Sequence, residues 1–471
     1  MKRIMITRFL VAFLLPFTLM IGVYGIPAAY AHNTENRGPR TWHVSVGGQS
    51  SDGAIQGEAY YPHIITIDVG DTVVWTLSSG EPHTVTFFGT GPLPDICAAA
   101  SDFSPCPLPL PSPYNGTSFV GSGLMLPTGF NWDNNFPLPH GNQTFALIFG
   151  NPGVYIYQSV VQAGMQGVVI VHAAGTPYPF TPGQYSDQAR QELNGDLTAA
   201  RQALASTMTP KTTTGPGNTQ THFVEAGINA PETTTVKLSP TEGSRVAGRA
   251  ILEITVSSTA SSLTLKVNLS GLTPGQTYSA GINYGVCGAT AQVSPFILPP
   301  FALNSITAGP DGRGQTTTDI TTPSSGNGIQ NIRIQSAGWF ISINQPNSEQ
   351  ASRPVACGNI VFHNAMVERF IPGTIRVHIG DTIIWTVPIV ENPFIIFPAG
   401  QPVPPFPDFA FTPPSGNATS YDGTSFAGSG ALKPTQTFVL TFTTPGTFPY
   451  IDPITTGFNG SVTVQATPSD D

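Results

Sequence analysis

The stretch P-H-I-I-T-I-D-V-G-D-T-V-V-W at residues 62–75 returns as P-G-T-I-R-V-H-I-G-D-T-I-I-W at residues 372–385. In each copy apolar residues fill every second position, a Gly-Asp pair follows, and a β-branched run leads to tryptophan. A period of two indicates a strand with one buried face, and Gly-Asp indicates a turn. The stretch therefore predicts a strand, a turn and a second strand, once in each half of the chain.

Two more blocks recur in the same order. One is Y-N-G-T-S-F-V-G-S-G at 114–123, which returns as Y-D-G-T-S-F-A-G-S-G at 421–430. The other is P-G-V-Y-I-Y at 152–157, which returns as P-G-T-F-P-Y at 445–450. Three blocks in one order indicate a duplicated domain.

The second copy is predicted to be discontinuous. The first copy opens with T-W-H-V-S-V-G at 41–47, and a similar opening, T-H-F-V-E-A-G, stands at 221–227, far upstream of the second copy. We expect 221–234 to supply the first strand of that copy and 363–467 the remainder, with a separate domain at 235–362 inserted between them. The alternative is that the short match is accidental.

One segment has helical spacing. Leu193, Leu197 and Leu204 recur along residues 186–207, the chain before them offers Ser and Asp as caps, and Pro210 stops the pattern. A Thr/Gly/Pro-rich linker follows at 212–220. We expect 183–220 to be a helix and a linker that pack on a sheet or space two domains.

The composition favours an all-β protein. Only 10% of the residues are charged, whereas the chain holds 50 glycines and 46 prolines, which suits short strands and many turns. The formal net charge is −9. An acidic chain is a poor ligand for nucleic acid, so we expect no nucleic-acid partner.

The N-terminus resembles a secretory signal peptide. Three basic residues lie among the first eight, an apolar run covers 9–28, and A-Y-A at 29–31 fits a cleavage site. We therefore expect residues 1–31 to be removed, leaving a secreted or cell-envelope protein with no membrane span. Retention of the apolar run as an anchor is the alternative, because its length approaches that of a short span.

The four cysteines fall into two local sets, Cys97 with Cys106 and Cys287 with Cys357. Disulfides persist in exported proteins, so two structural bridges are expected. A metal–thiolate site is the weaker interpretation, because neither set has C-x-x-C spacing.

The order of the repeated blocks resembles the cupredoxin family, which includes plastocyanin and azurin, over about 41–172 and 365–466. The resemblance implies two Greek-key β-sandwiches, at 41–174 and at 221–234 with 363–467. It also implies a copper site made by two histidines, a cysteine thiolate and a methionine at one end of each sandwich.

The first copy departs from that ligand set. His83 and Met165 stand at the places of one histidine and of the methionine, but Ser159 stands at the cysteine place and Gln162 at that of the second histidine. A hydroxyl is neither soft nor ionised at neutral pH, so no blue-copper centre is expected. No cofactor is assigned firmly. The alternative is weak copper binding at His83 and Met165 with Gln162, to which His63 or His140 could contribute.

In the second copy the family ligands are absent. Asp452, Thr455 and Phe458 stand at the cysteine, histidine and methionine places, and N-P-F at 392–394 replaces the His83 region. We expect this copy to hold no metal and Phe394 and Phe458 to fill its site end by apolar packing.

The segment 235–362 resembles the copper/zinc superoxide dismutase and chordin-type (CHRD) sandwiches through G-L-T-P-G at 271–275 and A-C-G at 356–358. That group binds metal through an H-x-H pair, but Gly281 and Asn283 stand at those places here. A third sandwich without dismutase activity is expected.

Three functions compete. An electron carrier of the blue-copper type, which the family implies, would need the missing thiolate. An enzyme would need a reactive constellation, and no triad, phosphate-loop or zinc motif is found. A secreted binding or cell-envelope module needs only stable sandwiches with variable loops, such as 107–114 and 402–414. We therefore expect a non-enzymatic module with degenerate copper sites and an unidentified protein or cell-envelope partner.

Overall fold

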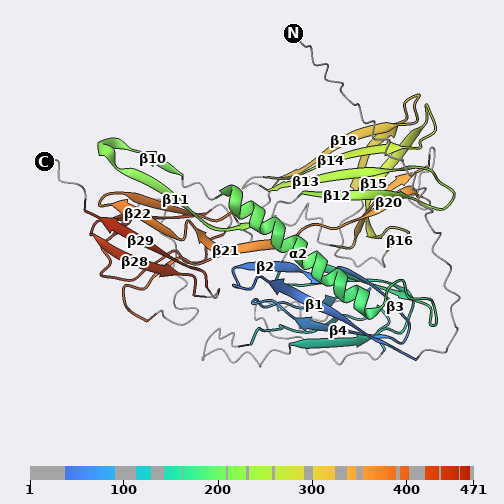
Figure 1. Cartoon of the computed structure of the whole chain (residues 1–471), viewed down its shortest axis with the longest axis horizontal. Coiled ribbons are helices and arrows are strands. Elements are labelled where there is room, and N and C mark those ends of the chain that lie inside the picture. The colour runs from blue at the N-terminus through green and yellow to red at the C-terminus, as the bar shows by residue number, and fades with distance from the viewer. Residues whose placement is uncertain are drawn as a thin grey trace, which may run out of the picture. The chain divides into compact units, whose positions relative to one another are not determined.

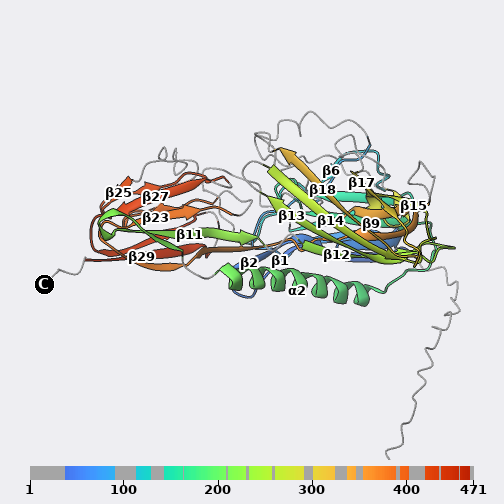
Figure 2. The ribbon, with the colours of Figure 1, turned by 90° about the horizontal axis from the view of Figure 1, so that it is seen from above.

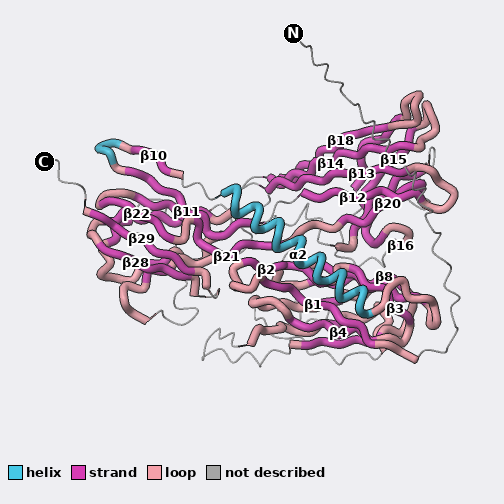
Figure 3. The backbone as a smooth tube through the Cα atoms, viewed as in Figure 1, coloured by secondary structure: helices cyan, strands magenta, loops and turns pink. Residues whose placement is uncertain are grey.

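The computed structural model describes residues 38–90, 113–128, 143–162, 164–207, 211–229, 233–256, 260–290, 301–323, 337–345, 354–388, 393–402, 419–433, 436–453, 455 and 457–466. The predicted signal peptide, Cys97, Cys106, His140 and most of the two Pro-rich loops lie outside these ranges. The described residues are mostly β, with several sheets and a single α-helix (Figures 1 and 3), so the expected fold class is confirmed. They all belong to one compact unit, Gly38–Asp471.

The first repeat is a sandwich of two sheets. Its strands are β1 (Thr41–Gln49), β2 (Ile55–Tyr61), β3 (Ile64–Asp68), β4 (Thr72–Leu77), β5 (Thr86–Phe87), β6 (Val120–Gly121), β7 (Thr144–Ile148), β8 (Gly153–Gln158) and β9 (Gln166–His172). One sheet runs β2-β1-β4-β7 and the other β3-β9-β8-β5-β6. The inward-facing residues form an aromatic core around Trp42, Trp75 and Tyr157. Side chains alternate between buried and exposed or partly exposed along β4 and β7, whereas β2 is buried along its whole length.

The second repeat has the same plan. Its strands are β11 (Gln220–Asn229), β21 (Ala365–Ile371), β22 (Thr374–His378), β23 (Thr382–Thr386), β24 (Ile396–Phe397), β25 (Thr419–Tyr421), β26 (Ala427–Gly428), β27 (Thr437–Phe442), β28 (Gly446–Ile451) and β29 (Asn459–Gln465). β11 pairs with β23 in parallel and with β21 antiparallel, as β1 pairs with β4 and β2. Both first strands carry a bulge at a left-handed glycine, Gly47 in β1 and Gly227 in β11.

The Gly-Asp turn has the same task in both repeats. The Asp71 carboxylate accepts hydrogen bonds from the Arg40 amide at 2.7 Å and the Trp42 indole at 2.8 Å. The Asp381 carboxylate accepts the Gln220 amide at 2.7 Å and lies 3.4 Å from the His222 ring. Each aspartate therefore fixes the start of the first strand beside the strand that follows the turn, which is why the repeat keeps this residue.

The two repeats share one sheet. Residues 55–57 of β2 pair antiparallel with residues 365–367 of β21, and the Gln56↔Met366 pair lies at the centre. The flanking bonds are reciprocal, because the Glu58 amide donates to Asn364 and the Glu368 amide donates to Ala54. Since the repeats are offset by 310 positions here, this junction has local two-fold symmetry: β2 meets β21 as it would meet a copy of itself.

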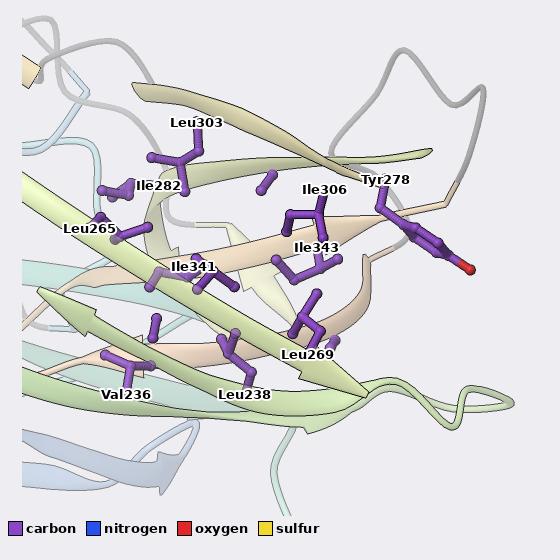
Figure 4. Packing of buried hydrophobic residues seen from close by; sticks show 14 of the residues in the cluster. Val236, Leu238, Leu265, Leu269, Tyr278, Ile282, Leu303, Ile306, Ile341 and Ile343 are labelled. Carbon is purple, nitrogen blue, oxygen red and sulfur yellow. The ribbon is translucent and has the colours of Figure 1, made fainter. Parts of the chain in front are cut away.

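The inserted segment forms a third β domain. Its strands are β12 (Thr233–Pro240), β13 (Ala247–Val256), β14 (Ala260–Ser270), β15 (Thr277–Val286), β16 (Ala289–Thr290), β17 (Phe301–Thr307), β18 (Gly314–Pro323), β19 (Trp339–Asn344) and β20 (Pro354–Ile360). They form one sheet that wraps around an aliphatic core, part of which Figure 4 shows. β12 begins at Thr233, within the stretch that the sequence assigned to the second repeat, because the chain turns into the inserted domain directly after β11.

The predicted Cys287–Cys357 disulfide is confirmed in this third domain, where it links the end of β15 to β20. Asn283, at a place where the dismutase resemblance would require a histidine, donates a hydrogen bond to the Ser342 hydroxyl at 2.8 Å. This residue therefore joins neighbouring strands β15 and β19. Apolar residues Val286 and Ala337 of the third domain also pack on Val154 and Val168 of the first repeat.

The helix α2 spans Pro182–Thr207, which is four residues longer at its start than the sequence predicted. Thr181 explains the earlier start: its hydroxyl accepts the Gln184 amide at 3.3 Å, in the manner of a cap. The expected linker is partly ordered, because β10 (Thr212–Thr214) pairs with β11 and a short 3-10 turn, η2 (Pro216–Asn218), follows. No helix of the described residues is long and apolar enough to cross a membrane.

α2 covers the junction of the two repeats. The apolar side of the helix, with Leu197, Ala200 and Ala203, packs on residues of three strands. These residues are Ile55 of β2, Ile228 of β11, and Ala365, Val367 and Ile371 of β21. Figure 2 shows α2 running along this face beside β1 and β2. The helix therefore contacts both repeats and joins them, rather than merely spacing them.

Candidate functional site

The predicted ligand positions of the first repeat lie at one end of the sandwich. His83 precedes β5 and forms a two-way backbone bridge with Met125, with N–O distances of 3.1 and 2.8 Å. The turn between β8 and β9 carries Ser159, Gln162 and Met165, and the Ser159 amide donates to the Met165 carbonyl at 3.0 Å. The Ser159 hydroxyl joins the two parts, because it accepts the Thr84 amide at 3.3 Å.

His83 is completely buried. A Cβ placed on Gly47 would lie 2.8 Å from the His83 Nε2 atom, so the absence of a side chain on that bulge glycine makes room for the ring. The Glu58 Oε2 atom lies 3.8 Å from the same nitrogen. Burial lowers the pKa of His83 to about 3, which keeps the imidazole neutral at ordinary pH. A neutral imidazole can bind a metal, but this one is shielded from solvent.

The residues present do not fit a thiolate-bound copper ion. The Ser159 hydroxyl occupies the thiolate position and already accepts two backbone amides, those of Thr84 and Gln162, each at 3.3 Å. Gln162 offers an amide where a second imidazole would be needed. Across the described part of the chain, no group of three or more His, Cys, Asp or Glu side chains is arranged to hold a metal ion.

The second repeat reproduces the backbone bonds of this end with other side chains. The Asp452 carboxylate accepts the Phe394 amide at 3.1 Å, as Ser159 accepts that of Thr84. The Asp452 amide donates to Phe458 at 2.8 Å and the Phe458 amide to Thr455 at 3.2 Å. These bonds make Asp452, Thr455 and Phe458 the equivalents of Ser159, Gln162 and Met165.

The expectation for Phe394 needs correction. The Leu432 amide donates to Pro393 at 3.0 Å, as the Met125 amide donates to His83, so Pro393 is the equivalent of His83. Phe394 belongs instead to a small cluster with Ile396 on the other side of the strand. Phe458 does fill the site end, where its ring stacks on Phe370 at 4.4 Å between centroids. Adjacent strand residues face opposite sides, which explains the difference.

His63, one of the two histidines considered as additional ligands, contacts a different group. Its Nδ1 atom lies 2.7 Å from the Glu192 carboxylate of α2, and its backbone amide donates to the same carboxylate at 2.9 Å. His63 is therefore part of the attachment of the helix. His140 lies outside the described residues.

The sequence did not identify three carboxylic acids that lie near the site end, Glu58, Glu81 and Glu368. Glu58 and Glu368 are buried at equivalent positions of β2 and β21. Burial raises the pKa of the Glu81 carboxyl, although a hydrogen bond with the Glu368 side chain opposes the shift. The loop that leads to His83 therefore contacts the second repeat. The sequence did contain a signal for two of these acids, because Glu58 of β2 and Glu368 of β21 stand at equivalent places in two mostly apolar strands.

No family model matches the chain, and no curated protein matches it. Among solved structures, part of the chain is similar to amicyanin. A reduced proline-to-phenylalanine variant shares 17% identity over 28% of this chain and 82% of the amicyanin chain, with a TM-score of 0.16. The Cu(I) form of a methionine-to-alanine variant shares 16% identity over 30% and 89%, with a TM-score of 0.17. Similarity this limited shows nothing about copper binding or function in this chain.

Proposed function

We propose that the chain is an exported multidomain protein of cupredoxin-like architecture that acts as a binding or cell-envelope module, not as an enzyme. In this proposal the copper sites of both sandwiches have become structural. The observation that carries the proposal is the shared role of Ser159 and Asp452, whose side-chain oxygens accept the amides of Thr84 and Phe394. Because Ser159 and Asp452 make the same kind of hydrogen bond in the two repeats, a structural role explains both side chains without a metal.

The surroundings of His83 support the same proposal. Glu58 and Gly47 lie against its ring, and Glu81, two residues earlier, contacts Glu368 of the second repeat. An electron carrier must bring its redox centre close to a partner surface. Here the four side chains at the ligand places, His83, Ser159, Gln162 and Met165, are all buried within the chain. The partner, a protein or a cell-envelope component, would bind elsewhere, with the Pro-rich loops as the first candidates.

The alternative is residual copper binding in the first repeat. It is favoured by His83 and Met165, which both persist and are both buried at the site end, whereas Pro393 and Phe458 replace them in the second repeat. The superoxide dismutase-like or chordin-type character of the third domain, like the absence of nucleic-acid partners, stays a prediction.

Copper titration followed by visible and EPR spectroscopy separates the two functions. We expect no intense blue band, and identical EPR spectra from the wild-type protein and from His83→Ala. A copper EPR signal that disappears in His83→Ala would establish the alternative, and an intense blue band would overturn the proposal because it requires a thiolate ligand.

A gain-of-function variant provides the positive control. Ser159→Cys combined with Gln162→His restores the missing donor types next to His83 and Met165, so this double variant should bind copper with a strong thiolate-to-copper absorption. The expected outcome is a band in the double variant alone. Export is tested separately: mass spectrometry of the protein recovered outside the cytoplasm should show a chain that begins at His32, directly after A-Y-A.

A further inference from the structure

The attachment of α2 contains a cluster of ionisable side chains that the proposed function does not use. We name it the junction cluster: Tyr61, His63, Glu192, Asp196 and His363. Glu192 and Asp196 lie one turn apart on α2, so both carboxylates face the same side of the helix. Tyr61 and His63 come from the end of β2 and the turn after it. His363 lies just before β21, the strand of the second repeat that pairs with β2.

Contacts with the first repeat are short and mostly buried. The Glu192 carboxylate lies 2.7 Å from the His63 ring and also accepts the Gln188 amide group at 2.8 Å. The Tyr61 hydroxyl donates to the Asp196 carboxylate at 2.6 Å. Leu193, between these two acids, lies against the glycines of β1 and β2, where a Cβ on Gly48 would meet it at 2.6 Å. The first half of the helix is thus fitted to the first repeat.

Asp196 continues the cluster to the second repeat. Its other carboxylate oxygen lies 2.8 Å from the His363 Nδ1 atom, and the His363 side chain is 48% exposed. The backbone approaches closely here, since a Cβ on Gly195 would lie 3.3 Å from the His363 ring. One buried carboxylate therefore bridges Tyr61 of one repeat and the histidine that leads into β21 of the other.

The charged groups that act on the two histidines lie on α2 and in the turn after β2. His63 faces Glu192 and Asp196 of α2, and His363 faces Asp196 together with the charge of His63. For His63, burial works against the charged form, but Glu192 and Asp196 outweigh it and the pKa is raised. For His363, the hydrogen bond with Asp196 raises the pKa. The Glu192 pKa is lowered in spite of burial, chiefly by His63, whereas Tyr61 stays a neutral donor because burial and Asp196 raise its pKa.

We propose that α2 is a pH-dependent strap across the junction of the two repeats, firmest when His63 and His363 carry protons and looser when they are neutral. A protonated His63 adds an electrostatic attraction to the Glu192 carboxylate, which lies 2.7 Å from its ring. For His363, the hydrogen bond with Asp196 becomes charge-assisted, which makes it about twice as strong as the same bond from a neutral ring. Because both histidine pKa values are raised, the added stability is complete below the unfolded value of about 6.5 and is lost as pH rises through the folded values. The carboxylates must stay ionised, so the strap is firmest in mildly acidic solution, near pH 5 to 6.

Hydrogen exchange measured by mass spectrometry on the full chain tests this proposal. After correction for the intrinsic pH dependence of exchange, the opening constant of α2 amides should rise about tenfold between pH 5.5 and pH 8 in the wild-type protein. In the double variant His63→Gln/His363→Gln, which keeps hydrogen-bonding groups but cannot be charged, the opening constant should be nearly independent of pH over this range. It should match the wild-type value at pH 8.

A matched control is His43→Gln, because His43 is an exposed histidine of β1 and does not belong to the junction cluster. This variant should keep the full pH dependence of the wild type. If the double variant does not fold, His363→Gln alone serves, since the half-exposed side chain tolerates substitution, and about half of the effect on a logarithmic scale should remain. The proposal is overturned if the α2 amides of the wild type show no pH dependence, or if the histidine variants show the same dependence as the wild type.

Discussion

The two repeats keep the same backbone hydrogen bonds while their side chains at the site end differ. In the first repeat this end holds His83, Met165 and Ser159, and in the second it holds Pro393, Phe458 and Asp452. The carboxylate of the Gly-Asp turn and the glycine bulge of the first strand are kept in both. The sandwich therefore depends on acceptors for particular amides, whereas the residues at the family's ligand places can be exchanged without loss of the fold.

The largest expected difference between the repeats is in acid. His83 has a pKa of about 3 in the folded protein because it is buried, against about 6.5 when unfolded. As pH falls from 6.5 to 3, only the unfolded chain takes up this proton, which should lower the free energy of unfolding by up to about 5 kcal/mol. Denaturant titrations at several pH values, on the wild type and on His83→Gln, measure the effect.

Subtracting the pH dependence of the unfolding free energy of His83→Gln from that of the wild type isolates the contribution of His83, because the junction cluster contributes equally to both proteins. Pro393 stands at the equivalent position and has no titratable group, so the second repeat contributes nothing of this kind. Parallel curves for the wild type and His83→Gln would show that the ring is not held neutral by the fold.

The next effect concerns the cores, which should respond alike. Trp75 and Trp385 are both fully buried at the centre of their aromatic clusters. Trp75→Ala and Trp385→Ala should each lower the free energy of unfolding by about 3–5 kcal/mol, because each leaves a large cavity. Scanning calorimetry of both variants checks this. A strong loss in one repeat with none in the other would show that the two sandwiches are not equivalent in packing.

A smaller effect is expected where a glycine lies over a tyrosine ring. A Cβ on Gly167 would lie 2.4 Å from Cζ of Tyr157, and a Cβ on Gly460 would lie 2.4 Å from Cζ of Tyr450. Gly167→Ala and Gly460→Ala should each cost about 1–3 kcal/mol through overpacking. Urea denaturation measures both. Gly183→Ala near the start of α2 is the control, because nothing lies closer than 4.0 Å to its added Cβ. A neutral Gly167→Ala would contradict the close packing.

The smallest predicted effect concerns the residues at the thiolate place. Ser159→Ala removes the acceptor of the Thr84 and Gln162 amides, and Asp452→Ala removes an acceptor of the Phe394 amide. Each should lower the free energy of unfolding by about 1–2 kcal/mol, the usual cost of a buried amide that loses its partner. Unchanged denaturation midpoints in both variants would argue that these positions are not structural, and would weaken the proposed function.

Sequence patterns predicted the elements that depend on local chemistry. The alternation before Gly70-Asp71 predicted β3, and the β-branched run after it predicted β4. The short opening motif at 221–227 corresponds to β11, which pairs with β23 in the second repeat. The Cys287–Cys357 bridge also followed from spacing and expected export. For the strands the deciding residues are close together in the chain or repeated within it, whereas for the bridge the chemistry of cysteine joins two residues that are 70 positions apart.

The junction could not be predicted in the same way. Nothing in I-Q-G-E-A-Y-Y of β2 identifies β21 as its partner, because backbone pairing requires no particular side chains. The sequence predicted that Phe394 fills the site end of the second repeat. In the structure Pro393 is the equivalent of His83, and this difference of one place puts Phe394 on the other face. The junction cluster combines residues from β2, α2 and the segment before β21, and only the folded chain brings them together.

The symmetric pairing of β2 with β21 also bears on how such a chain assembles. In separate sandwiches this self-complementary edge would create a dimer whose population depends on dilution, because two molecules would have to meet. Joined in one polypeptide, the edges face each other at a fixed effective concentration, so the pairing becomes independent of how much protein is present. The joined edges are also withheld from other chains, which removes a template for aggregation at the place where an open sheet is most exposed to it.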